Sequence, residues 1–140
     1  MASGRTERFQ LSQWQAGDPV LREEFNEDNA KIDQALGTIP QIVLGTYTGD
    51  GAANRIVDLG FTPRAVYVAA SDGTSFLYGG GTGKLSGGLA LRGHPCVEYV
   101  RNRTVLAICE SGFQVGYSVD TAQYVYTNVS GAEYRYVALK

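Results

Sequence analysis

Residues 65–78 read Ala65-Val66-Tyr67-Val68-Ala69-Ala70-Ser71-Asp72-Gly73-Thr74-Ser75-Phe76-Leu77-Tyr78, a pattern that predicts two β-strands joined by a tight turn. Val, Tyr and Phe favour strands, and Asp-Gly between two such runs favours a hairpin. The same pattern recurs from Gln41 to the end of the chain and predicts nine strands: Ile42–Tyr47, Arg55–Leu59, Ala65–Ala70, Thr74–Tyr78, Cys96–Val100, Thr104–Cys109, Phe113–Val119, Tyr124–Thr127 and Tyr134–Leu139. Short strands at this spacing predict an antiparallel β-sandwich or barrel.

The chain before this β-region predicts one α-helix, over about residues 18–36. Asp18-Pro19 is a typical helix start, because Asp caps the free N–H groups and Pro suits the first turn. Gly37 is a typical stop. We therefore expect a mainly β protein with an N-terminal segment over residues 1–37 and a β-sandwich domain over residues 38–140.

An apolar stripe runs along the expected helix at helical spacing, with a polar residue inside it. Its members are Leu21, Phe25, Asn29, Ile32 and Leu36. A helix of this length is not stable alone in water, so the stripe must pack against something. It packs either on the β-domain of its own chain or on copies of itself, where an Asn in the seam fixes register and oligomer state.

Composition and charge exclude several classes of function. The 140 residues include 12 Lys and Arg and 14 Asp and Glu, a net charge of −2. Residues 1–37 hold four basic and seven acidic residues, so residues 38–140 carry a net charge of +1. This balance gives no broad basic surface for nucleic acid. The sequence lacks both the apolar run of about 18 residues needed to span a membrane and an apolar stretch behind its first residues, so neither membrane insertion nor a signal peptide is expected.

No motif in the sequence predicts catalysis, a cofactor or a metal. The Gly-rich stretch from Gly79 to Lys84 fails as a phosphate-binding loop, because Tyr78 and Leu85 occupy positions that require Gly and Ser or Thr. It instead predicts a long, flexible hairpin loop. His94 is the only histidine, and ordinary zinc-ligand spacing is missing around it. Two cysteines, Cys96 and Cys109, are expected to be free, mostly buried thiols rather than a disulfide.

The tyrosines form pairs that suggest a surface. Tyr124 and Tyr126 fall on one face of one predicted strand, and Tyr134 and Tyr136 fall on one face of another. If the two strands pair, the four rings form a cross-strand aromatic patch. The rings then either bind a ligand or line the core or a subunit interface, and the second alternative is favoured.

Three segments of the chain resemble phage and prophage tail proteins. They are the segment from Leu11 to Asp33, with Trp14, Asp18-Pro19 and Phe25-Asn26-Glu27-Asp28-Asn29, the Gly45–Val68 segment, and a C-terminal part made up of Gly112-Phe113-Gln114-Val115, Asn128 to Gly131 and Tyr134-Arg135-Tyr136-Val137-Ala138. The resemblance implies a virion tail protein made in the bacterial cytoplasm, usually a homotrimer, with a fold similar to the trimeric-lectin sandwich. It also implies contacts with other tail or baseplate proteins and with a host-surface glycan or protein. The chain departs from a full fibre in having no long shaft repeats.

The resemblance favours self-association of the helix stripe and a homotrimeric β-domain that adheres to a host glycan. Residues expected at loops and strand ends supply the candidate contacts, because aromatic rings stack on sugars and basic groups hold acidic ones: Phe76, Tyr78, Lys84, Arg92, His94 and Tyr99. The alternatives are a structural assembly subunit with no host ligand and, disfavoured by size and by the lack of a marked site, a glycan-degrading enzyme. We do not expect an enzyme.

Overall fold

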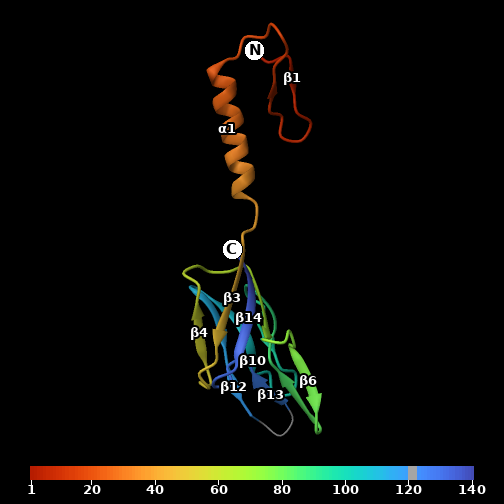
Figure 1. Cartoon of the computed structure of the whole chain (residues 1–140), viewed down its shortest axis with the longest axis vertical. Helices are drawn as coiled ribbons and strands as arrows, with labels where there is room; N and C mark the ends of the chain where they lie inside the picture. The colour runs from red at the N-terminus through yellow and green to blue at the C-terminus, as the bar shows by residue number, and fades with distance from the viewer. Residues whose placement is uncertain (120–122) are drawn as a thin grey trace. The chain divides into compact units, whose positions relative to one another are not determined.

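A computed structural model describes residues 1–119 and 123–140, and the chain divides into two compact units, Met1–Pro40 and Gln41–Lys140. The first unit holds a two-stranded ribbon of β1 (Gly4–Arg5) and β2 (Ser12–Gln13), followed by helix α1 (Arg22–Gly37) (Figure 1). The predicted helix is thus present but begins four residues later than expected.

Helix α1 begins later than predicted because Asp18 accepts hydrogen bonds from residues outside the helix. Its carboxylate accepts hydrogen bonds from the Ser3 N–H and hydroxyl, at 3.0 and 2.6 Å, and from the Gln15 N–H at 2.8 Å. The hydrogen bonds from Gln15 and Ser3 hold the pKa of Asp18 below its ordinary value. Asp18 therefore ties down the N-terminal segment instead of capping the helix, and Leu21 occupies the N-cap position with no side-chain hydrogen bond.

The second unit consists of three four-stranded sheets (Figure 1). Sheet I has the strand order β3-β14-β5-β8, sheet II the order β4-β11-β10-β9 and sheet III the order β12-β13-β7-β6. All neighbours in them are antiparallel except β13 and β7, which are parallel. The strands are β3 (Ile42–Thr48), β4 (Arg55–Asp58), β5 (Ala65–Ala70), β6 (Phe76–Gly79), β7 (Thr82–Leu85), β8 (Gly88–Leu91), β9 (Cys96–Val97), β10 (Thr104–Cys109), β11 (Gly112–Val115), β12 (Tyr117–Ser118), β13 (Gln123–Tyr126) and β14 (Glu133–Leu139).

One hydrophobic core joins sheets I and II. Val66, Val68 and Tyr134 of sheet I are buried together with Leu106 and Phe113 of sheet II. The alternating burial along β14 shows that one face of sheet I lines this core while the other faces outward. The mainly β fold class is confirmed.

The Gly-rich stretch is where the sequence prediction is wrong. Residues 79–84 do belong to a hairpin, but not to a long loop: β6 ends at Gly79, and Thr82–Leu85 is strand β7, which is paired on both sides. Gly88 then begins β8, which pairs with β5. Gly87 is needed for this arrangement, because a Cβ there would lie 1.8 Å from the Val68 carbonyl oxygen. The glycines thus allow close backbone packing, which a pattern based on side-chain alternation does not detect.

Two predicted strands are shorter than expected because side chains bind the backbone. Strand β9 ends at Val97, since the buried Glu98 carboxylate accepts hydrogen bonds from the N–H groups of Val100, Arg101 and Arg103. The strand predicted over Phe113–Val119 is divided at Gly116, whose N–H donates to the Thr127 hydroxyl at 2.9 Å.

Candidate functional site: exposed apolar faces and a tyrosine row

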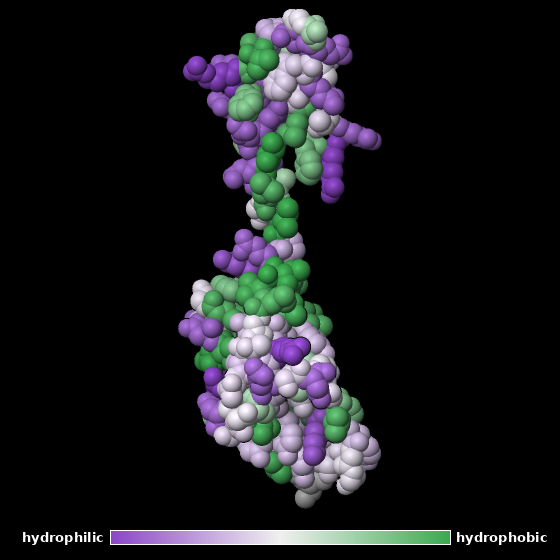
Figure 2. Space-filling model, viewed as in Figure 1, coloured by the Kyte–Doolittle hydropathy of each residue, from purple (hydrophilic) through white to green (hydrophobic). Residues whose placement is uncertain are grey.

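Helix α1 buries its acidic side and exposes its apolar side. Glu24 and Asp28 are its buried residues, whereas the apolar members of the predicted stripe have exposed fractions of 38–61% and Asn29 is also exposed. The stripe consists of Leu21, Phe25, Asn29, Ile32 and Leu36. Figure 2 shows hydrophobic residues exposed along this unit.

The β1–β2 ribbon accounts for the buried acids. The Asp28 carboxylate accepts a hydrogen bond from the Ser12 N–H at 2.7 Å and lies 3.5 Å from the Lys31 ammonium. The Glu24 carboxylate accepts from the Ala2 N–H at 2.9 Å, and Arg5 lies 3.7 Å from both carboxylates. Burial disfavours ionisation of Asp28, but the hydrogen bonds from Ser12 and the charge of Lys31 outweigh it and lower its pKa. The N-terminal unit therefore covers the polar side of its own helix and leaves the apolar stripe outside.

Sheet I also carries apolar side chains on its outer face. The strand register places Leu44 beside Val137, Val137 beside Tyr67, and Tyr67 beside Leu89, so that one row crosses all four strands. A second row consists of Ile42, Leu139, Ala65 and Leu91. We call these two rows the apolar face of sheet I. Apart from the half-buried Leu139, its larger side chains have exposed fractions from 38% at Val137 to 72% at Leu44. Apolar surface this contiguous is typical of interaction sites.

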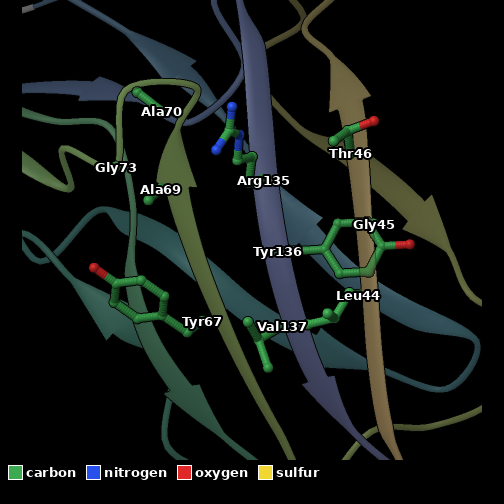
Figure 3. Close-up of a pocket in the computed structure, with 10 residues that line it drawn as sticks. All are labelled: Leu44, Gly45, Thr46, Tyr67, Ala69, Ala70, Gly73, Arg135, Tyr136 and Val137. Atoms are coloured by element: carbon green, nitrogen blue, oxygen red, sulfur yellow. The ribbon is translucent and has the colours of Figure 1, made fainter.

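A shallow depression of about 440 Å³ lies on this face (Figure 3). Leu44, Val137 and Tyr67 lie across its floor, and the Arg135 side chain stands beside them as a basic group. Tyr136, whose ring packs against the core, lies over Gly45: a Cβ at Gly45 would lie 2.3 Å from the Tyr136 hydroxyl oxygen. The rest of the lining is mainly apolar, with the hydroxyls of Thr46, Tyr67 and Tyr136 as its other polar side-chain groups, and these residues provide no arrangement of acid, base and nucleophile.

The six predicted contact residues do not form a single cluster. Phe76 and Tyr78 lie on one face of β6, while Lys84, opposite Leu77, lies on the other face of sheet III. The Arg92 guanidinium donates to the carbonyl oxygens of Thr62 and Pro63, at 2.9 and 3.4 Å. The remaining two are exposed in different connections: His94 in the turn between β8 and β9, and Tyr99 in the loop after β9.

Lys84 instead joins a group of tyrosines on sheet III. Tyr117 and Tyr126 face each other across β12 and β13 with ring centroids 5.7 Å apart, and Tyr124 stacks on Tyr126 at 5.4 Å. The Lys84 ammonium lies 5.6 Å from the centroid of the Tyr126 ring. We call these four residues the tyrosine row. The sequence pattern indicated the Tyr124 and Tyr126 pair but not Tyr117 or Lys84, whose positions depend on strand pairing.

The four-tyrosine patch, which depended on pairing of the two tyrosine strands, does not form. Strand β14 pairs with β3 and β5, not with β13, so Tyr134 and Tyr136 are not members of the tyrosine row, although the Tyr134 hydroxyl donates a hydrogen bond to the Tyr126 carbonyl oxygen. Tyr134 is 2% exposed, stacks on Tyr47 at 4.9 Å, and accepts a hydrogen bond from the Val129 N–H. Burial raises the pKa of the Tyr47 and Tyr134 hydroxyls. These two rings are structural core residues.

The other predicted residues are located as follows. Cys96 and Cys109 are free thiols, as predicted, but they are half-buried rather than mostly buried. Burial raises the pKa of Cys96. In the part of the chain that the structure describes, no helix has the length and apolarity needed to cross a membrane.

Comparison with known proteins finds no matching protein family, no matching curated protein and no matching solved structure.

Proposed function

We propose that this chain is a homotrimeric structural protein of a phage or prophage tail whose β unit adheres to a glycan on the host surface. The observation that carries the proposal is that each unit, taken by itself, leaves an apolar surface uncovered: the helix stripe in the first unit and the apolar face of sheet I in the second. The sequence resemblance to tail proteins is the reason for assigning these surfaces to a virion tail.

The helix stripe supports self-association because its own unit leaves it uncovered. Its apolar members are spaced four, seven and four residues apart, with Asn29 between Phe25 and Ile32. Identical helices that pair along such a seam bury the apolar side chains, while the Asn amides hydrogen-bond to one another and fix the register. Burial of the stripe also supplies the stability that a 16-residue helix lacks by itself.

The apolar face of sheet I supports the same assembly in the β unit. Ile42 and Leu44 of this face are 66% and 72% exposed. The core that sheets I and II share supports a sandwich arrangement of the trimeric-lectin type, with the outer face of sheet I available for neighbouring copies. Three copies then present three host-binding surfaces, and weak single contacts gain strength through multivalency.

Two measurements on the full chain test the proposal. Light scattering after size-exclusion chromatography is expected to give the mass of three 15.1-kDa protomers, and a monomer at micromolar concentration would contradict it. The labelled protein is expected to bind cells of the host strain and not unrelated bacteria.

A trimer that binds no cells would instead support the alternative, a virion assembly subunit without a host ligand. The scattered positions of the six predicted contact residues favour that alternative over an adhesin built on those residues. Release of reducing ends from a surface polysaccharide would indicate the disfavoured enzyme.

A further inference from the structure

We propose that the tyrosine row on sheet III, formed by Tyr117, Tyr124, Tyr126 and Lys84, is a binding site for an anionic polysaccharide. The assignment rests on the adhesive role proposed above and names the surface that performs it. The evidence is the placement of the four side chains, their unused hydrogen-bonding groups and the rigid layer behind them.

The strand register places the four side chains on one face. Tyr117 lies opposite Tyr126 in the antiparallel pair of β12 and β13, and Tyr124 lies opposite Lys84 in the parallel pair of β13 and β7. Tyr124 and Tyr126 are two residues apart on β13 and so point to the same side. All four side chains are partly exposed. The row therefore spans three neighbouring strands, a length suited to successive sugars of a chain.

The opposite face of β13 is packed, which fixes the row in place. Gln123 and Val125 alternate with the two tyrosines and are 6% and 2% exposed. Directly behind them, Arg103 donates to the Gln123 carbonyl oxygen at 2.6 Å and to the Glu98 carboxylate at 3.0 Å. A pre-organised surface loses little conformational entropy when a ligand binds.

The polar groups of the row are available to a ligand. Within residues 1–119 and 123–140, the hydroxyls of Tyr117, Tyr124 and Tyr126 form no hydrogen bond, in contrast to the core hydroxyls of Tyr47 and Tyr134. No carboxylate among the same residues lies within 4.0 Å of the Lys84 ammonium, whose recorded contact is the Tyr126 ring.

The chemistry of these groups selects the ligand. Tyrosine offers a broad apolar surface for the C–H faces of sugar rings and a hydroxyl for their oxygens, at a low cost in side-chain entropy. The Lys84 ammonium, which has no carboxylate partner among the described residues, favours a sugar that carries a carboxylate or a phosphate. A neutral oligosaccharide would use the rings but not this charge.

The test measures binding of the full chain to polygalacturonate and to a poly(glycerol phosphate) teichoic acid, which separate carboxylate from phosphate as the anion. Fully methyl-esterified polygalacturonate is the uncharged control. We expect the wild-type chain to bind at least one anionic polymer, and to bind it about tenfold more weakly when salt screens the charge. Binding to neither anionic polymer, or equal binding to the methyl ester, would overturn the proposal.

Three single substitutions separate the tyrosine row from the rest of the surface. Lys84→Gln and Tyr124→Ala are each expected to weaken binding of the anionic polymer about tenfold, and Lys84→Gln is also expected to reduce the salt dependence. Lys140→Gln is the matched control for Lys84→Gln, because the Lys140 ammonium also lies near an aromatic ring, 5.4 Å from the centroid of Phe61, but outside the tyrosine row. An unchanged thermal midpoint and trimer mass would show that each variant is folded.

The outcomes distinguish the site from the function. Host cells that bind Lys84→Gln and Tyr124→Ala as strongly as the wild type would overturn the assignment of the row and leave the adhesive function standing. A trimeric wild type that binds neither cells nor anionic polymers would contradict both. Loss of the trimer in Tyr124→Ala would show that the row is a subunit interface, and would also overturn the site.

Discussion

Replacing Leu44 by threonine is expected to weaken the trimer while leaving each protomer folded. Leu44 is 72% exposed in the isolated chain and stands in the first row of the apolar face of sheet I. Threonine has a β-branched side chain that suits a strand, so the substitution changes surface apolarity more than strand stability.

The magnitude follows from the exposed fraction. Full burial of a leucine side chain contributes about 1.5–3 kcal/mol, and with 72% of Leu44 still exposed, assembly gains about 1–2 kcal/mol per protomer, or about 3–6 kcal/mol per trimer. The dissociation constant of a monomer–trimer equilibrium depends on the square of the protomer concentration. Each 1.4 kcal/mol changes this constant about tenfold. The concentration at half-dissociation therefore rises about ten- to a hundredfold.

Sedimentation equilibrium over a wide concentration range measures this shift. Ile56→Thr is the matched control, because Ile56 is 57% exposed on β4 of sheet II, outside the apolar face of sheet I. The reasoning is refuted if Leu44→Thr and Ile56→Thr dissociate at the same concentration as the wild type. It is equally refuted if both variants weaken the trimer to the same extent.

Three further substitutions test other parts of the structure. Asn29→Leu is expected to tighten self-association but to mix oligomeric states, since a polar seam residue specifies one state at a cost in stability; native mass spectrometry giving one unchanged species would contradict this. Glu98→Gln is expected to destabilise the β unit by about 1.5–3 kcal/mol at pH 7. Burial opposes ionisation of Glu98, but the Arg103 guanidinium and backbone N–H groups outweigh it and lower its pKa. The ionised Glu98 carboxylate therefore stabilises the β unit fully above a pH of about 4.5, and this stabilisation is lost as pH falls through the lowered pKa. The free energy of unfolding of the Gln variant, measured by urea denaturation, should therefore vary less with pH below about 4.5 than that of the wild type. Gly87→Ala places a Cβ 1.8 Å from the Val68 carbonyl oxygen and should cost at least about 2 kcal/mol, whereas Gly79→Ala, with open space around it, should leave the thermal midpoint nearly unchanged.

Several elements could be predicted from local sequence because local physical chemistry determines them. The strands Ala65–Ala70 and Thr104–Cys109 have the predicted bounds, since apolar β-branched and aromatic runs between turn residues have few alternatives. The helix was predicted from its apolar spacing. Its start was not, because Asp18 binds Ser3 and Gln15, partners that no capping rule includes.

The candidate sites show the same division. The stripe from Leu21 to Leu36 could be predicted from the sequence. Its exposure could not, because the exposure depends on the β1–β2 ribbon binding the acidic side of the helix. The apolar face of sheet I was missed entirely. Leu44, Val137, Tyr67 and Leu89 come from four separated segments, and only their register brings them into one row.

The sequence by itself determined the mainly β fold class, the N-terminal helix, the apolar stripe and the free cysteines, because each depends on side-chain periodicity or composition within a short window. Tertiary structure alone decided that Tyr134 enters the core while Tyr124 and Tyr126 line a surface with Tyr117 and Lys84. The four tyrosines on β13 and β14 have the same local pattern. Their different environments arise from strand order, which is fixed by how the sheets share one core and not by any local preference of the residues.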